Sequence, residues 1–247
     1  MQTFGLLGKA LTHSFSQQFF TEKFIHHHIN HAEYQLFSLN SIDEVQPLLK
    51  MSSLFGFNVT IPYKTVIIPY LDELDRVAKE VGAVNCVVKQ NGKWVGYNTD
   101  VVGFWETLSG MRYAVGGERY AVILGAGGAA KAVGYVLKQH NIPFQMVSRN
   151  KTTETIIYHE VTAQLIQNAT FIIHATPLGM FPNINEKPPI PYDAIHGNHV
   201  LIDLIYNPDE TLFLKEGKKR GAFIMNGLQM FTTQAEESFK LFFPNIF

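Results

Sequence analysis

The segment 120–131, which reads YAVILGAGGAAK, constrains the fold more than any other part of the chain. Its apolar residues 122–124 predict a buried strand, and Gly125, Gly127 and Ala130 then fit the pattern G-x-G-x-x-[GA]. Apolar residues at helical spacing follow. Glycines let the backbone turn tightly and let a pyrophosphate approach, and a helix N-terminus offers unpaired N–H groups to that anion. We therefore predict a dinucleotide-binding turn, the alternative being a plain glycine turn between a strand and a helix.

The segment that follows this helix indicates which dinucleotide would bind. Residues 143–147 predict the next strand, and an NAD site would place an acidic residue near its end, about 20 residues after the glycines. No acidic residue occurs between Glu118 and Glu154, and the strand runs instead into SRNK at 148–151. A guanidinium such as that of Arg149 can hold a 2′-phosphate through two hydrogen bonds, which favours NADP over NAD. The alternative is that the two basic residues are ordinary solvated charges.

Composition limits the class of protein. The chain has 247 residues, 46% hydrophobic and 17% charged, which suits one large or two modest globular domains. A net charge of −1 gives no reason to expect a nucleic acid or an acidic membrane surface as partner. The single cysteine, Cys86, cannot form an internal disulfide, so we expect a reducing, cytoplasmic location. There is no apolar run of 18 residues and no N-terminal signal pattern.

Short apolar runs predict strands, and amphipathic or capped stretches predict helices, along the whole chain. We expect strands at 3–7, 34–37, 57–60, 83–88, 93–97, 122–124, 143–147, 171–175, 200–205 and 222–225, and helices at 17–28, 41–51, 72–81, 100–108, 133–140, 211–220 and 228–243. Asn91 and Gly92 predict a two-residue hairpin. The second half alternates strand and helix, which predicts a parallel, doubly wound sheet. The first half mixes a hairpin with helices and is expected to form a separate α/β domain, with a hinge at Gly116 and Gly117.

Polar residues gather near several predicted strand ends, where open α/β sheets place ligands. Ser14 and Ser16 could together bind a carboxylate, and Lys64, on a loop, is a candidate proton donor that Asp100 could orient. Each has a plainer interpretation, because loop lysines are usually solvated and serines often cap helices. The histidines at 26–28 and 31 are expected to form a solvated helix end, with no metal site, because consecutive helical side chains diverge.

Eight stretches in order resemble the shikimate dehydrogenase family, and the match spans nearly the whole chain. They are HSFS at 13–16, NVTIPYK at 58–64, GAVN at 82–85, GYNTD at 96–100, GAGGAA at 125–130, ATPLGM at 175–180, DLIYNP at 203–208 and NGLQMFTTQA at 226–235. The resemblance implies a reversible, NADP-dependent reduction of 3-dehydroshikimate to shikimate. It also implies two α/β domains with the site in the cleft between them: a mixed-sheet substrate domain at 1–101 and 226–247, and a Rossmann-like, doubly wound NADP domain at 102–225.

The resemblance also implies roles for individual residues. Lys64 and Asp100 would form the catalytic pair, and Ser14, Ser16 and Tyr206 would hold the substrate carboxylate. Thr60, Asn85 and Gln234 would join the pair in binding the ring hydroxyls. The pyrophosphate would lie on Gly125, Ala126, Gly127, Gly128, Ala129 and Ala130, the 2′-phosphate on Ser148, Arg149, Asn150 and Lys151, and the nicotinamide beside Thr176, Leu204 and Gly227.

The chain departs from the family pattern at two positions, since Ser148 and His174 stand where asparagine is usual. The chain also ends at Phe247, which is short for the family, so a final helix is expected to be trimmed. Two alternatives remain open: an enzyme that also uses quinate or NAD, and a non-catalytic relative that only binds NADP. The intact Lys64 and Asp100 argue against the second. The sequence carries no signal for an oligomeric state.

Overall fold

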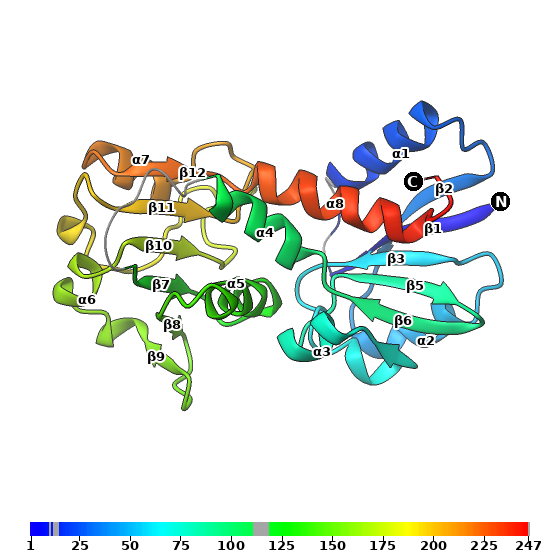
Figure 1. Cartoon of the computed structure of the whole chain (residues 1–247), viewed down its shortest axis with the longest axis horizontal. Coiled ribbons are helices and arrows are strands. Elements are labelled where there is room, and N and C mark those ends of the chain that lie inside the picture. Colours follow the sequence, from blue (N-terminus) through cyan, green and yellow to red (C-terminus); the bar gives the residue numbers. More distant parts are fainter. Residues whose placement is uncertain (10, 12–14, 111–118, 247) are drawn as a thin grey trace. The chain divides into compact units, whose positions relative to one another are not determined.

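The chain forms two compact units, each built on its own six-stranded sheet (Figure 1). The computed structural model describes residues 1–9, 11, 15–110 and 119–246. Unit 1 comprises Met1–Asp100 and Thr233–Phe247, and unit 2 comprises Val101–Thr232. The return to unit 1 falls inside helix α8 (Leu228–Phe242), later than the 226 expected from the sequence. The predicted hinge at Gly116 and Gly117 lies outside the described residues.

The sheet of unit 1 is mixed, as predicted. Its strands are β1 (Gln2–Gly8), β2 (Ala32–Ser38), β3 (Gly56–Val59), β4 (Glu73–Leu74), β5 (Cys86–Gln90) and β6 (Lys93–Tyr97), in the order β2-β1-β3-β5-β6-β4. Strand β5 is antiparallel to β3 and β6, and the other pairs are parallel. The hairpin between β5 and β6 turns at Asn91 (φ 50°) and Gly92 (φ 81°), which confirms the turn predicted from this dipeptide.

Two hydrophobic cores cover the two faces of this sheet. On one face, phenylalanines of α1 (Phe15–His26) and α8 pack with Phe4 of β1. On the other, Leu7 and Phe57 pack beneath α2 (Val45–Leu49) and α3 (Arg76–Val81). Neighbouring residues of a strand point to opposite faces, so an apolar strand such as β1 can supply both cores. The sheet is therefore buried between helices, as Figure 1 shows within this unit.

Two helices of unit 1 are shorter than the sequence predicted. The helix expected at 72–81 begins only at Arg76, because the side chain of Asp75 accepts hydrogen bonds from the N–H groups of Val77 and Ala78 and caps the helix there. The preceding residues form β4 instead. The helix expected at 41–51 is a 3₁₀ turn, η1 (Ile42–Glu44), followed by the short α2.

The sheet of unit 2 is parallel throughout, as the alternating pattern predicted. Its strands are β7 (Ala121–Leu124), β8 (Phe144–Ser148), β9 (Thr155–Ile157), β10 (Phe171–His174), β11 (Val200–Asp203) and β12 (Phe223–Met225), in the order β12-β11-β10-β7-β8-β9. The order reverses between β7 and β10. In open sheets of this kind, ligands bind at that reversal, outside the carboxyl ends of the strands.

Helices cover both faces of the second sheet as well. Helix α4 (Asp100–Ser109), α5 (Gly128–Gln139) and the start of α8 pack on Ile123 and Ile173. Helices α6 (Ala163–Gln167) and α7 (Leu212–Lys219) pack on Val122 and Leu201. All four residues of β7, β10 and β11 are buried, which explains why these strands are apolar except for His174 and Asp203 at the ends of β10 and β11. Strand β9 and helix α6, of three and five residues, were not expected from the sequence.

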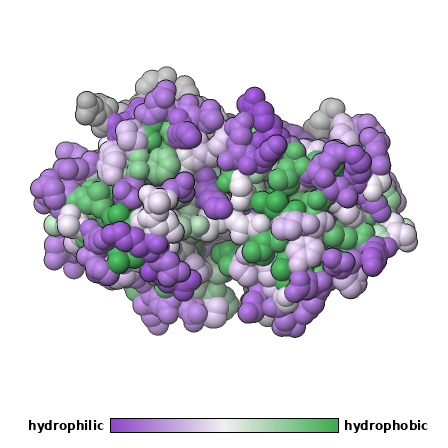
Figure 2. Space-filling view, turned by 90° about the horizontal axis from the view of Figure 1, so that it is seen from below, coloured by the Kyte–Doolittle hydropathy of each residue, from purple (hydrophilic) through white to green (hydrophobic). Residues whose placement is uncertain are grey.

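The surface combines polar and apolar residues. On the face drawn in Figure 2, hydrophobic residues lie in separate patches among hydrophilic ones. Within the part of the chain that the structure describes, no helix is long and apolar enough to cross a membrane.

Candidate active site

Lys64 lies on a loop of unit 1 that is held in place by hydrogen bonds. The loop follows β3, and the N–H of Tyr63 donates to the carbonyl of Thr60 over 2.9 Å. The hydroxyl of the buried Tyr63 donates to the Leu39 carbonyl at 2.7 Å, and the Val84 N–H donates to the Lys64 carbonyl at 2.7 Å. Backbone and ring contacts therefore fix the point from which the lysine side chain extends.

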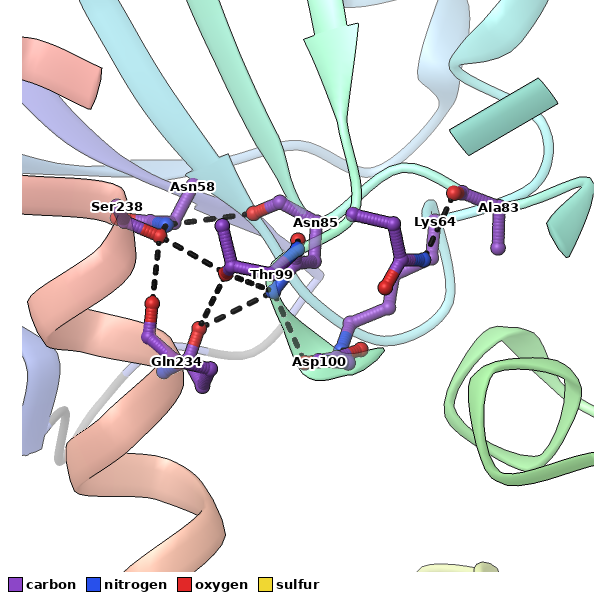
Figure 3. Close-up of polar contacts among 9 residues, drawn as sticks. Asn58, Lys64, Ala83, Asn85, Thr99, Asp100, Gln234 and Ser238 are labelled. Carbon is purple, nitrogen blue, oxygen red and sulfur yellow. Dashed lines mark hydrogen bonds and ion pairs between the residues drawn. The ribbon is translucent and has the colours of Figure 1, made fainter. Parts of the chain in front are cut away.

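Lys64 meets Asp100, the first residue of α4. Nζ of Lys64 lies 2.5 Å from Oδ2 of Asp100, and the two side chains are 16% and 5% exposed. The turn before α4 is held by Asn98, whose side chain donates to the Ala83 carbonyl over 2.8 Å. The two predicted catalytic residues thus form a largely buried ion pair within one unit (Figure 3). A buried pair of this kind keeps its ammonium group in a fixed position for a ligand.

The side-chain amide of Asn85 lies among three acceptors. Nδ2 of Asn85 is 2.9 Å from Oδ1 of Asp100, 2.9 Å from Oγ1 of Thr99 and 3.1 Å from Oε1 of Gln234. The amide group carries only two hydrogens, so the three acceptors exceed its donors. The Thr99 hydroxyl also donates to Oε1 of Gln234 at 3.4 Å, so the four side chains form one connected network. Figure 3 shows these side chains converging from the residue before β5, the start of α4 and α8.

A second layer of polar residues supports this cluster; the sequence analysis placed Asn58 and Thr99 within its motifs without a role of their own, and it missed Ser238. Oγ of Ser238 accepts a hydrogen bond from Nδ2 of Asn58 at 2.8 Å and donates to the Gln234 carbonyl at 2.9 Å. It also lies 3.1 Å from Oγ1 of Thr99. Asn58, Thr99 and Ser238 are buried. Its spacing could have indicated Ser238, because this residue follows Gln234 by one helical turn and shares its face of α8.

The other predicted substrate-binding residues come from separate segments of the chain. Thr60 directly follows β3, and its N–H donates to the Leu7 carbonyl at 2.9 Å. Ser16 is half-buried in the first turn of α1, and Ser14 lies outside the described residues. Tyr206 belongs to unit 2, where its ring contacts that of Phe231 at a tilt of 36°, with centroids 4.7 Å apart. Burial raises the pKa of Tyr206 to about 12, so its phenol is a donor at neutral pH.

The glycine turn of unit 2 has the geometry of an anion cradle. Gly125 has φ +128°, and a Cβ added there would lie 2.8 Å from the Ala175 carbonyl oxygen, so only glycine fits. Gly127 caps α5 without any side-chain hydrogen bond, and an added Cβ there would meet nothing within 4 Å. The first N–H groups of α5, from Gly128 to Ala130, are thus left uncapped by side chains beside open space. These features fit a dinucleotide pyrophosphate.

The segment after β8 offers cationic and hydroxyl groups at the next strand end. Ser148 closes the strand, and its Oγ accepts from the N–H of Asn150 at 3.4 Å. Arg149 is exposed. Lys151 forms an ion pair with Glu160, which lowers the pKa of that carboxyl. Because Lys151 already has this partner, Arg149 is the better candidate for binding an anion.

Three further predicted residues follow the strands beyond the reversal point. Thr176 comes after β10, and its methyl group would lie 3.2 Å from a Cβ at Gly125. Leu204 comes directly after β11, and a Cβ on Gly227 would overlap its carbonyl oxygen. Close backbone packing therefore requires glycine at 227.

Among the described residues, no group of three or more histidine, cysteine or acidic side chains is arranged to hold a metal ion.

Comparison with known proteins identifies the family. A family model described as the shikimate dehydrogenase substrate binding domain matches residues 6–87. A Bacillus cereus protein named shikimate dehydrogenase (NADP(+)) is 35% identical, with 99% of this chain and 95% of that protein covered. The chain belongs to the shikimate dehydrogenase family.

Solved structures of shikimate dehydrogenases have the same fold. The enzyme from Aquifex aeolicus matches with a TM-score of 0.86 and 33% identity, covering 98% of this chain and 92% of that one. The enzyme from Thermus thermophilus, solved in complex with NADP(H) and shikimate, matches with a TM-score of 0.84 and 25% identity, covering 99% and 94%. The mixed sheet and the parallel sheet predicted from the sequence are thus both confirmed as a shikimate dehydrogenase architecture.

Proposed function

We propose that this chain is an NADP-dependent shikimate dehydrogenase, which reversibly reduces 3-dehydroshikimate to shikimate. The observation that carries the proposal is the buried Lys64–Asp100 ion pair in a chain whose full-length relatives bear that name. An ammonium group beside a carboxylate and an amide cluster suits a substrate with a ketone and ring hydroxyls, because each hydroxyl can both donate and accept.

Lys64 acts as the general acid in this proposal. NADPH, when bound, supplies a hydride to the ketone carbon, and the ketone oxygen then needs one proton to become the alcohol. Lys64 gives that proton from Nζ, and Asp100 holds the ammonium in position at 2.5 Å. In the oxidative direction Lys64 takes the proton back. A positioned acid of this kind contributes about 10²–10⁴ in rate.

The polar cluster of unit 1 binds the ring. Asn85 and Gln234, with Thr60 and the catalytic pair, supply donors and acceptors for the ring hydroxyls. Supporting this, the Asn85 amide already lies among three acceptors. For the substrate carboxylate we propose Ser14, Ser16 and Tyr206, whose hydroxyls are donors.

Unit 2 holds the cofactor, and unit 1 supplies most of the residues proposed for the substrate. We propose that the pyrophosphate lies on the turn formed by Gly125, Ala126, Gly127, Gly128, Ala129 and Ala130, where uncapped N–H groups face open space. Ser148, Arg149, Asn150 and Lys151 receive the 2′-phosphate. Thr176, Leu204 and Gly227, at neighbouring strand ends, line the nicotinamide.

We also propose a cytoplasmic location. Cys86, the single cysteine of the chain, is buried, and burial raises the pKa of its thiol to about 12. The thiol is therefore protonated and inert at neutral pH. A protein without disulfides is typical of a reducing compartment.

An absorbance assay at 340 nm, with shikimate or quinate as substrate and NADP or NAD as cofactor, tests the proposal. We expect the highest kcat/KM with shikimate and NADP. Binding of NADP without any shikimate-dependent change in absorbance would instead indicate a non-catalytic relative. A preference for quinate would contradict the substrate assignment.

A substitution of Arg149 tests the proposal that the enzyme prefers NADP to NAD. Arg149→Ala should lower kcat/KM for NADP by about 10- to 100-fold, the loss expected for charge-assisted hydrogen bonds, and leave the value for NAD unchanged. Lys138→Ala, a change of charge in the last turn of α5, is the control. An equal loss with both cofactors would contradict a 2′-phosphate contact.

A further inference from the structure

Strands β10 and β11 are neighbours in the sheet of unit 2 (Figure 1). His174, one of the two departures from the family pattern, ends β10 and pairs in register with Asp203 at the end of β11. Both side chains are fully buried. Nε2 of His174 is 2.6 Å from Oγ1 of Thr176, and Nδ1 is 3.1 Å from Oδ1 of Asp203. The Nδ1 contact lacks the alignment of a hydrogen bond, so it is electrostatic, and the bond to Thr176 is the directional one.

The surroundings of Asp203 determine which ring nitrogen accepts. One oxygen of Asp203 accepts from the N–H of Ile205 at 3.0 Å, and the other accepts from the hydroxyl of Thr211 at 2.5 Å. Both oxygens therefore act as acceptors, as in a carboxylate. A hydrogen on Nδ1 of His174 faces this carboxylate favourably, which leaves Nε2 as the acceptor. Thr176 then donates its hydroxyl hydrogen to His174.

These contacts fix Thr176 on both branches of its side chain. Its Oγ1 is held by His174 and accepts from the N–H of Leu178 at 3.3 Å. Its methyl group lies against Gly125, the first residue of the cofactor turn. A threonine has three staggered rotamers, and the hydrogen bond to a rigid buried imidazole selects one of them. The remaining lone pair of Oγ1 is left as an acceptor.

We propose that His174, supported by Asp203, is a positioning residue that fixes Thr176 for the nicotinamide half of the cofactor. The inference rests on the proposed function, because it takes NADP as the ligand of unit 2. A histidine and a carboxylate are costly to bury, and simple packing of β10 against β11 needs neither. Thr211 also caps α7 through Leu214, so the carboxylate is itself fixed by a helix end.

The proposal predicts a loss of binding affinity only for ligands that contain the nicotinamide half of the cofactor. His174→Leu removes the acceptor and keeps an apolar side chain, and Thr176→Val removes the hydroxyl and keeps the shape. Each should raise the Kd of NADPH, measured by fluorescence titration, by about three- to tenfold, the worth of one hydrogen bond. The Kd of adenosine 2′,5′-bisphosphate, which has no nicotinamide, should stay within about twofold.

Three comparisons separate positioning from general structure. The double variant should bind NADPH no more weakly than either single variant, because both remove the same bond. His174→Gln, which can present an acceptor to Thr176, should restore NADPH affinity. His199→Gln changes another buried histidine of unit 2, one bonded to the Ile166 carbonyl, and should leave both affinities unchanged.

Three results would each contradict the positioning role of His174. Equal weakening of NADPH and the bisphosphate, additive losses in the double variant, or unchanged NADPH binding in Thr176→Val would overturn the positioning role. Thr176→Val provides this answer even if His174→Leu does not fold. Failure of the unmodified enzyme to bind NADPH would instead overturn the proposed function and this inference with it.

Discussion

Asp100 is held on both of its carboxylate oxygens: Oδ2 lies 2.5 Å from Nζ of Lys64, and Oδ1 accepts from the amide of Asn85 at 2.9 Å. Each partner is a donor, so the site requires an acceptor at both positions. A carboxylate satisfies this, whereas an amide of the same shape has one oxygen and one NH₂ group. The charge of Asp100 is therefore needed as well as its size.

Asp100→Asn should lower kcat by about 10- to 100-fold, since one charge-assisted hydrogen bond is lost and a donor then faces a donor. Steady-state kinetics with NADPH and 3-dehydroshikimate measure this effect. Asp75→Asn makes the same chemical change at the cap of α3 and should leave kcat unchanged. A kcat for Asp100→Asn within about twofold of the unmodified enzyme would show that the charge of Asp100 has no role.

Ser238→Ala should weaken both stability and substrate binding. It removes one of the two acceptors of the buried Asn58 amide and leaves only the Asn85 carbonyl, which costs about 1–3 kcal/mol of unfolding free energy, measured in urea. Because Asn85 and Gln234 are then less fixed, the KM for shikimate should rise while the KM for NADP stays constant. Ser109→Ala, at an exposed position of α4, is the control and should change stability by less than about 0.5 kcal/mol. An unchanged KM for shikimate would confine Ser238 to a stabilising role.

Two glycines of the cofactor turn should respond differently to alanine. Gly125→Ala places a methyl against the Ala175 carbonyl at a left-handed φ, so it should destabilise the protein by about 1–3 kcal/mol in thermal or urea unfolding. Gly127→Ala meets no atom of the protein and has φ −77°, so stability should be kept. Its methyl would occupy the space proposed for the pyrophosphate and should raise the Kd of NADPH about tenfold or more. Normal NADPH affinity in Gly127→Ala would contradict that placement.

The sequence predicted the features that depend on short-range chemistry. The central strands of unit 2, β7, β10 and β11, were predictable because burial on both faces favours apolar runs, whereas the three-residue β9 carries no such signal. The turn at Asn91 and Gly92 was predictable because few other residues adopt its positive φ angles. The start of α3 was not, because β4 pairs with β6, about 20 residues further along, and that contact outweighs local helix propensity.

The sequence singled out candidate residues such as Lys64 and Asp100, but it could not predict which side chains contact one another. Lys64 and Asp100 stand 36 positions apart, and no spacing rule joins them; only the order of motifs suggested a pair. Asn58 lay within a recognised motif but had no role assigned to it, and Ser238 was missed because it looks like an ordinary polar residue of a helix. Their meeting depends on α8 returning to unit 1 after the whole of unit 2, a separation of 180 residues.

The most direct test of the central claim is the kcat of Lys64→Ala. With Lys64 as the general acid, kcat for 3-dehydroshikimate reduction should fall by about 10²–10⁴, with a smaller change in KM and unchanged NADPH binding. A fall of less than about tenfold would contradict proton transfer by Lys64 and remove the basis of the mechanism.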